Sequence, residues 1–233
     1  MLCAASMMTA CNCNTSCNSD EKKTSQFEKT ASDYKATLNP SNKIIAERID
    51  SAVQKVFYLD PSDEAYGVNP INNIMMHDYA TNETKALLPE EERINDYLVW
   101  GELIDPELAE NEEYKSFNHC FNLDYRSSEL IGDRLFMMIH TEMSYDMETS
   151  LLFYVNVLDN SLHYVCTCDD VRYDKANGVI DVHDELMKPA GADLEYNYTI
   201  SASLSDKEYA ALRNEIEEIE IQMSDKWREE NAD

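Results

Sequence analysis

The chain has 233 residues, 43% of them hydrophobic, which is long enough and apolar enough for a globular fold with a buried core. Its 19 basic and 46 acidic residues give a net charge of −27, which excludes nucleic acid as a partner because no clustered basic patch opposes it. The five glycines are too widely separated to form either of the common phosphate-binding loops, which argues against nucleotide-dependent chemistry.

The N-terminal segment contains a candidate targeting signal. Met8-Thr9-Ala10-Cys11 resembles the lipobox of bacterial lipoproteins, in which small residues precede a cysteine that is lipid-modified after signal cleavage. Met8 stands where leucine is commonest in this motif. No lysine or arginine precedes Cys11, and the apolar run before it, about nine residues, is short for a signal; a start codon further upstream would explain these last two departures. The resemblance implies that residues 1–11 are a short signal and that Cys11 carries a lipid anchor. The protein would then be attached to a bacterial cell envelope, outside the cytoplasmic membrane.

The alternative for this segment is a tail whose cysteines bind a soft metal or do nothing. Cys11, Cys13 and Cys17 have a suitable spacing, but no nearby histidine offers a fourth ligand. Residues 12–41 are rich in Asn, Ser, Thr and Lys, which predicts a disordered polar tether. Residues 42–230 would then form a single folded domain.

The first predicted elements of the domain are a helix and a hairpin. After the start signal Pro40-Ser41, Ile45, Ile49, Ala52 and Val56 recur at spacings of four, three and four, which predicts an amphipathic helix of about four turns. Residues 71–90 predict a hairpin with its polar turn at 81–84. The segment after it is ambiguous, and we favour a strand over 97–100.

The most regular pattern runs from residue 134 to residue 183. It predicts strands over 134–143 and 151–158, and a tight turn at Asp159-Asn160 leads into a third strand over 161–168. In the second of these strands Phe153, Val155 and Val157 should share a face, and in the third Tyr164, Cys166 and Cys168 should share one. A further hairpin around Asn177-Gly178 completes an antiparallel meander.

The chain closes with a predicted long amphipathic helix. Ser205 and Glu208 have capping-box spacing. The apolar residues that follow recur at threes and fours. They are Tyr209, Leu212, Ile216, Ile219, Met223 and Trp227. One face of the helix is therefore apolar and suits either packing on a sheet or a protein partner.

These elements predict an α+β fold, in which an antiparallel meander carries an N-terminal helix and a long C-terminal helix. The four strands over 134–183 also resemble a blade of a β-propeller, which gives partial propeller blades as the alternative. The residues between the flanking helices are too few for four blades of about 40 residues each.

Two groups of residues are candidate sites. Cys166 and Cys168 lie two apart on a strand, so either could form a disulfide with Cys120 on a neighbouring strand, and buried free thiols are the alternative. The stretch YDKANGVIDVHDE resembles the centre of a calcium loop, with Asn177, Asp181 and Asp184 as oxygen ligands. However, Tyr173 and Lys175 occupy its first ligand positions, so we favour a hairpin turn at Asn177-Gly178.

No motif supplies a catalytic nucleophile, base and oxyanion donors together, and none indicates a cofactor. We therefore expect a cell-envelope lipoprotein that acts as a non-enzymatic binding or structural module. The alternatives are an extracytoplasmic hydrolase or metal-dependent enzyme that uses the scattered histidines and acidic residues, and an acidic module that binds a protein through the C-terminal helix.

Overall fold

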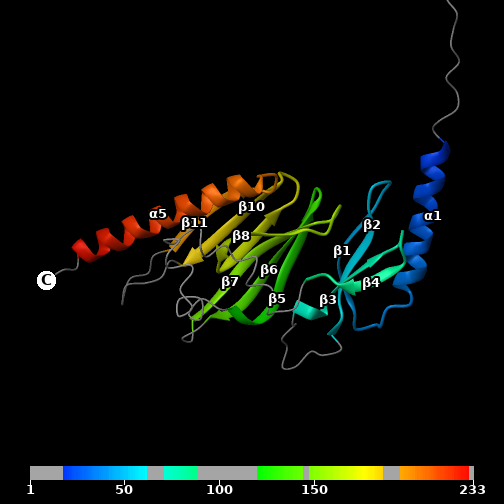
Figure 1. The fold of residues 1–233 in the computed structure, drawn as a ribbon, viewed down its shortest axis with the longest axis horizontal. Helices are drawn as coiled ribbons and strands as arrows, with labels where there is room; N and C mark the ends of the chain where they lie inside the picture. Colours follow the sequence, from blue (N-terminus) through cyan, green and yellow to red (C-terminus); the bar gives the residue numbers. More distant parts are fainter. Residues whose placement is uncertain (1–17, 62–70, 89–119, 144–146, 186–194, 231–233) are drawn as a thin grey trace, which may run out of the picture.

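Among the residues that the computed structural model describes, three antiparallel β-sheets and two long helices form the fold (Figure 1). The structure describes residues 18–61, 71–88, 120–143, 147–185 and 195–230. The predicted α+β class, with antiparallel sheets and a C-terminal helix, is confirmed. The N-terminal elements differ from those predicted.

The first sheet holds four strands in chain order, and the helix predicted from Ser41 to Val56 is wrong. The strands are β1 Lys43–Ile49, β2 Gln54–Leu59, β3 Ile74–Asp78 and β4 Glu83–Ala86, with a 3-10 helix at Ile71–Asn73. The Asp50 carboxylate accepts hydrogen bonds from the amides of Ala52 and Val53, at 2.7 and 2.8 Å. These bonds form the turn between β1 and β2, where the helix would have continued.

Strand β2 is covered on both faces, which explains its unbroken run of apolar residues. Phe57 and Leu59 face a core shared with the second sheet, whereas Val56 and Tyr58 face helix α1 (Asn18–Lys35). A strand buried on both sides shows no alternation, so its apolar positions can also match a helical period.

Helix α1 replaces part of the disordered tether predicted over 12–41, and that prediction is wrong for residues 18–35. Ala31 is buried, and the Tyr34 ring stacks on His77 of β3 with the ring centroids 3.6 Å apart. Lys35 forms an ion pair with Glu47 of β1 at 2.6 Å. These contacts hold the helix against the first sheet; residues 12–17 and Cys11 lie outside the described residues.

The predicted β3–β4 hairpin is confirmed, with its turn two residues earlier than predicted. Residues 79–82 connect the strands, and Asn82 takes a left-handed conformation with φ 57°. The Asp78 carboxylate accepts a hydrogen bond from the Ala80 amide at 2.8 Å, which tightens the turn. The strand predicted over 97–100 lies outside the described residues.

The second sheet is a meander in the order β5-β6-β7-β8. Its strands are β5 Cys120–Ile131, β6 Arg134–Met143, β7 Met147–Asn156 and β8 Leu162–Cys168. The predicted strands of this region and the turn at Asp159-Asn160 are confirmed, whereas β5 was not predicted. Phe153, Val155 and Val157 share a core, as predicted.

A β-bulge in β8 changes which side chains share a face. Leu152 of β7 pairs with Cys166, but the next residue, Phe153, pairs with Tyr164, so Val165 is an extra residue in β8. Tyr164 therefore packs against the first core, which lies between the first and second sheets. Cys166 and Cys168 lie in the second core, on the opposite face of the second sheet. The prediction that all three share a face is wrong.

The third sheet contains three strands in the order β11-β10-β9. They are β9 Asp170–Asp174, β10 Val179–Glu185 and β11 Glu195–Ser201. The hairpin around Asn177-Gly178 is confirmed, with Gly178 at φ 66°. The meander predicted over 134–183 is divided after Cys168 between two sheets, so these residues do not form one blade-like unit.

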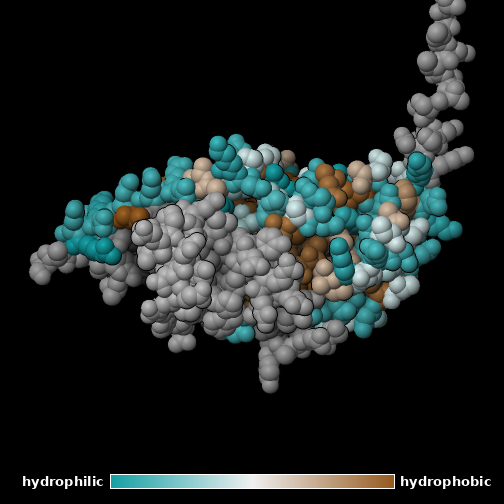
Figure 2. Space-filling model, in the orientation of Figure 1, coloured by the Kyte–Doolittle hydropathy of each residue, from teal (hydrophilic) through white to brown (hydrophobic). Residues whose placement is uncertain are grey.

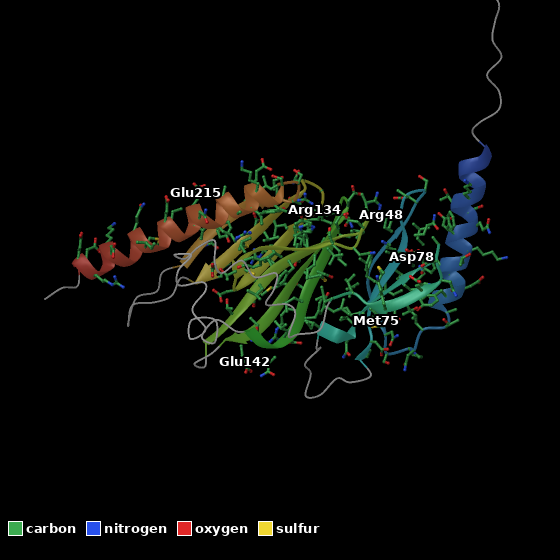
Figure 3. The ribbon with its side chains drawn as sticks, viewed as in Figure 1. Arg48, Met75, Asp78, Arg134, Glu142 and Glu215 are labelled. Atoms are coloured by element: carbon green, nitrogen blue, oxygen red, sulfur yellow. The ribbon has the colours of Figure 1, made fainter. Side chains whose placement is uncertain are left out.

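The second sheet contributes to two hydrophobic cores. One of its faces packs against the first sheet, and the other packs against the third sheet and helix α5 (Asp206–Glu230). Two cations connect the first sheet to turns of the second. Arg48, which is labelled in Figure 3, pairs with Asp133 and donates to the Gly132 carbonyl oxygen. Lys55 Nζ donates to the Val157 carbonyl oxygen at 2.6 Å.

Helix α5 begins at the predicted capping box. The amide and hydroxyl of Ser205 donate to Glu208 Oε2 at 2.7 and 2.6 Å. Tyr209 lies in the second core and Ile216 is also buried, but Ile221 is 55% exposed. The part of this face that Figure 2 colours by hydropathy is largely hydrophilic. Neither this helix nor any other in the described ranges has an apolar stretch sufficient to cross a membrane.

Candidate functional site

The outer face of the third sheet forms an open groove of about 450 Å³. Side chains alternate along each strand, so Val171, Val182 and Ile200 enter the second core while their neighbours point outward. The outward side chains at the groove are Asp170 and Arg172 of β9, Asp181 and His183 of β10, and Asn197 and Thr199 of β11. Every one of them is a hydrogen-bonding group.

Strand register arranges these six side chains in two rows across the sheet. Asp170, His183 and Asn197 are paired in one row, and Arg172, Asp181 and Thr199 are paired in the other. Within the first row the ring nitrogen Nδ1 of His183 is 2.9 Å from Asn197 Oδ1. Within the second, the Thr199 hydroxyl donates to Asp181 Oδ1 at 2.6 Å. The bonds fix the β10 and β11 side chains, which gives the groove a preorganised edge.

The β9 side of the groove carries unpaired charges. Arg172 is exposed and stands opposite Asp181 in the strand register. Neither Arg172 nor Asp170 makes an ion pair with any other residue that the structure describes. A guanidinium with its five N–H donors and a neighbouring carboxylate thus face solvent in the same groove.

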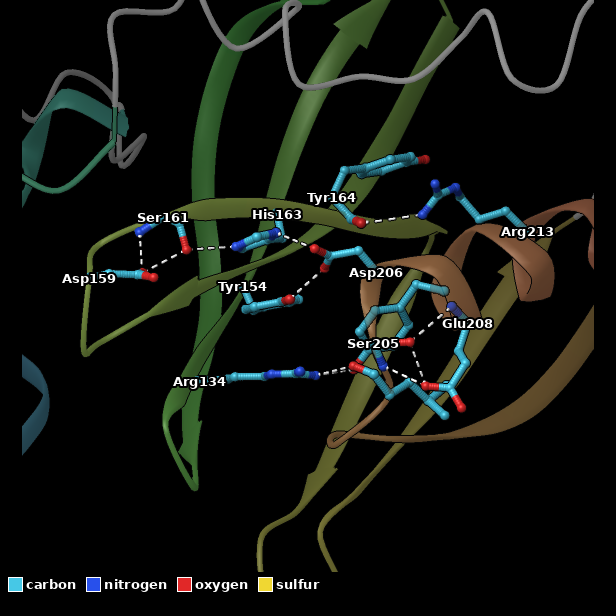
Figure 4. A network of polar contacts seen from close by, with 12 residues as sticks. Arg134, Tyr154, Asp159, Ser161, His163, Tyr164, Ser205, Asp206, Glu208 and Arg213 are labelled. Carbon is cyan, nitrogen blue, oxygen red and sulfur yellow. Dashed lines mark hydrogen bonds and ion pairs between the residues drawn. The ribbon is translucent and has the colours of Figure 1, made fainter.

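A second polar arrangement lies at the start of α5 (Figure 4). His163 Nε2 is 2.7 Å from the Ser161 hydroxyl, and His163 Nδ1 is 3.0 Å from Asp206 Oδ2. The Tyr154 hydroxyl donates to the other Asp206 oxygen at 2.6 Å. These distances are those of a Ser-His-Asp triad, so the arrangement has to be tested as a catalytic site.

Asp159 makes this triad unsuitable for nucleophilic catalysis. Its Oδ1 accepts the Ser161 hydroxyl at 2.7 Å and the Ser161 amide at 2.9 Å, and these bonds lower the pKa of the carboxyl. A hydroxyl has one proton, and while Asp159 holds it His163 cannot remove it. The carboxylate would also repel the oxyanion of an acyl-transfer intermediate, and it occupies the amide that could stabilise that oxyanion.

The same contacts connect the start of α5 firmly to the second sheet. The His163 ring, the Tyr154 ring and the Arg134 guanidinium lie in a column (Figure 4). The two ring centroids are 4.6 Å apart, and the Arg134 guanidinium carbon is 4.5 Å from the Tyr154 centroid. Arg134 also donates to the carbonyl oxygens of Ala202 and Leu204, just before α5. The network therefore fixes the first turn of α5 to β6, β7 and β8.

The three residues predicted as calcium ligands do not converge. Asn177 lies in the β9–β10 turn, where its amide group bonds to Asp174. Asp181 and Asp184 are three residues apart on β10, so they face opposite sides of the sheet. Asp181 is exposed in the groove, whereas Asp184 is buried. Among the described residues, no group of three or more His, Cys, Asp or Glu could hold a metal ion.

Asp184 is buried beside a second carboxylate, that of the exposed Asp169. Burial, followed by the charge of Asp169, raises the pKa of Asp184 to about 6. The carboxyl also has side-chain hydrogen bonds with Thr167 and Asp169. The pair lies where β10 meets the end of β8, on the side of the third sheet away from the groove.

The predicted disulfide partners are kept apart by strand order. Cys120 starts β5, and β6 and β7 lie between that strand and β8, which carries Cys166 and Cys168. Three strand spacings are roughly 14 Å, twice the separation that a disulfide tolerates. Cys166 and Cys168 are free and buried, and burial raises the pKa of Cys166 to about 12. Both thiols are therefore protonated and unreactive.

Comparison of the chain with models of protein families, with curated proteins and with solved structures finds no match.

Sequence reasoning overlooked both polar arrangements. The groove joins β11 to a hairpin, and β11 was not predicted. Alternation of polar and apolar residues in EYNYTIS was the available signal, since Tyr198 and Ile200 share one face. The triad-like network joins residues 161 and 206, and no local pattern indicates that contact.

Proposed function

We propose that the protein is a bacterial cell-envelope lipoprotein, anchored through an acylated Cys11, whose folded part binds a small polar ligand without transforming it. The observation that carries the location is the lipobox-like sequence Met8-Thr9-Ala10-Cys11. Lipid attachment through several acyl chains would give stable membrane association without a spanning helix.

The groove on the third sheet supports the binding role. Its volume of about 450 Å³ is in the range of small-molecule sites, and its lining side chains on β10 and β11 are held by cross-strand hydrogen bonds. The arrangement of its side chains provides recognition by hydrogen bonds and charge. None of its six outward side chains is a serine or cysteine, so these residues supply neither of those nucleophiles.

The lipid anchor is tested by metabolic labelling with an alkyne fatty acid in bacteria that produce the full chain. Label should enter the wild-type protein and a Cys13→Ser variant, which is the matched control because it removes a neighbouring thiol. It should not enter Cys11→Ser. Equal labelling of Cys11→Ser, or no labelling of the wild type, would refute the anchor.

A hydrolase is the second candidate, and the distances that join Ser161, His163 and Asp206 favour it. The bonds from Ser161 to Asp159 oppose it. Hydrolysis of p-nitrophenyl acetate by the purified protein separates the two functions. Turnover that Ser161→Ala abolishes, with the fold retained, would replace the binding role by an enzymatic one.

A further inference from the structure

We propose that the groove on the third sheet binds a zwitterion of dipeptide size, with Arg172 holding its carboxylate and Asp170 its ammonium group. The inference deepens the binding role proposed above and rests on it, but it does not depend on the lipid anchor. It starts from the charges that the groove leaves uncompensated.

The chemistry of the groove excludes three ligand classes in turn. An apolar ligand would cover six polar side chains without replacing their hydrogen bonds to water. A simple anion would meet two carboxylates in the groove and the field of a chain with net charge −27. A simple cation would meet the guanidinium of Arg172 between those carboxylates. A ligand that carries one charge of each sign can pair its anionic group with Arg172 and its cationic group with Asp170.

The spacing of the charged residues selects the length of the ligand. Asp170 and Arg172 are two residues apart on β9, so their side chains leave the strand about 6.6 Å apart on the same face. An extended dipeptide spans about 7 Å between its ends. The ammonium and carboxylate of a free amino acid are separated by a single carbon and cannot reach both residues equally well.

The remaining groove residues suit the middle of such a ligand. Arg172 can bind a carboxylate through two parallel N–H donors. Asn197 and Thr199 lie across β10 from these two charged residues and have amide and hydroxyl groups that can pair with a peptide unit. Asp181 lies opposite Arg172, and its Oδ1 accepts the Thr199 hydroxyl.

Isothermal titration calorimetry of the full chain with L-alanyl-L-alanine tests the proposal. The comparison ligand is the same dipeptide with an acetylated N-terminus and an amidated C-terminus, which keeps the shape and removes both charges. We expect the free dipeptide to bind and the blocked one to bind at least about tenfold more weakly, since both charge-assisted bonds are lost. Equal binding of the two ligands would overturn the proposal.

Variants locate the site. Arg172→Gln and Asp170→Asn should each weaken binding of the free dipeptide about tenfold or more. Lys175→Gln removes a cation from the turn of the same hairpin, outside the groove, and should leave binding unchanged. Unchanged binding in Arg172→Gln would refute the assignment.

A parallel titration with a neutral disaccharide separates failure of this inference from failure of the binding role. Binding of the disaccharide in place of the dipeptide, lost in Asn197→Ala, would keep the groove as a binding site and overturn the zwitterion. Absence of heat with every ligand would overturn both the zwitterion and the binding role. The fatty-acid labelling of Cys11 is unaffected by either result.

Discussion

Replacing Asp184 by asparagine should stabilise the protein at neutral pH. The carboxyl is buried between β10 and the end of β8, and its pKa is raised from 3.8 to about 6, first by burial and then by the charge of Asp169. At pH 7 the folded protein therefore contains a buried carboxylate that the unfolded chain would hydrate. Asparagine has no charge and can still donate a hydrogen bond to Asp169.

The pKa shift sets the magnitude and the pH range. Because the pKa of Asp184 is higher in the folded than in the unfolded state, the contribution of its protonated form to stability is fully present below pH 3.8 and is lost as pH rises through about 6. The loss corresponds to about 3 kcal/mol at neutral pH, and we expect about 2 kcal/mol in measurement because the site relaxes. Asp184→Asn should therefore exceed the wild type by that amount at pH 7.5 and match it below pH 4.

Urea denaturation at a series of pH values measures this difference. Asp174→Asn is the matched control, because this exposed carboxylate in the β9–β10 turn has a pKa that hydrogen bonds from Asn177 lower. It should give no gain at neutral pH. A gain in Asp184→Asn that is the same at pH 4 and pH 7.5 would show that packing, and not the charge, causes it.

Three further changes test other parts of the fold. Lys55→Met removes the donor to the Val157 carbonyl oxygen and to Asn160, so it should lower the free energy of unfolding by about 1–3 kcal/mol, whereas Lys85→Met on exposed β4 should have little effect in urea melts. Gly178→Ala should cost about 1 kcal/mol, since φ is 66° and no neighbouring atom would contact the new methyl group; thermal melting measures it. Burial lowers the pKa of His77, so the contribution of the neutral ring to folding stability is present above pH 6.5 and is lost as the pH falls. His77→Phe should therefore reduce the acid sensitivity of the helical circular dichroism signal, because His77 stacks on Tyr34 of α1. An unchanged acid midpoint would contradict this.

The same apolar spacing produced strands in one segment and a helix in another. Residues 45, 49, 52 and 56 recur at four, three and four and form two strands with the turn between them, while residues 27, 31, 34 and 38 have the same spacing and follow α1 into its C-terminal turn. Period alone does not distinguish these cases. Residues 45–56 include β-branched side chains and the turn-forming Asp50, whereas residues 27–38 include polar residues that favour helix between the apolar ones.

Local signals were sufficient where one face of an element is buried and its ends are marked. Helix α5 has a capping box and an apolar stripe, and the β7–β8 hairpin has alternating arms around a short turn, so both were predictable. The bulge at Val165 was not, because an extra residue changes the pairing without changing composition. The groove depends on the register of β11 against β10, a contact that only the folded chain defines.

The docked position of α1 limits how far the domain could move from a lipid surface. Seven residue steps separate Cys11 from Asn18, and even fully extended they reach about 25 Å. A chain acylated at Cys11 would thus keep its acidic domain within two or three Debye lengths of the headgroups at physiological ionic strength. Repulsion from anionic lipids would then influence which side of the domain faces outward. Release of α1 from His77 and Glu47 would lengthen the linker between Cys11 and the domain by the length of the helix.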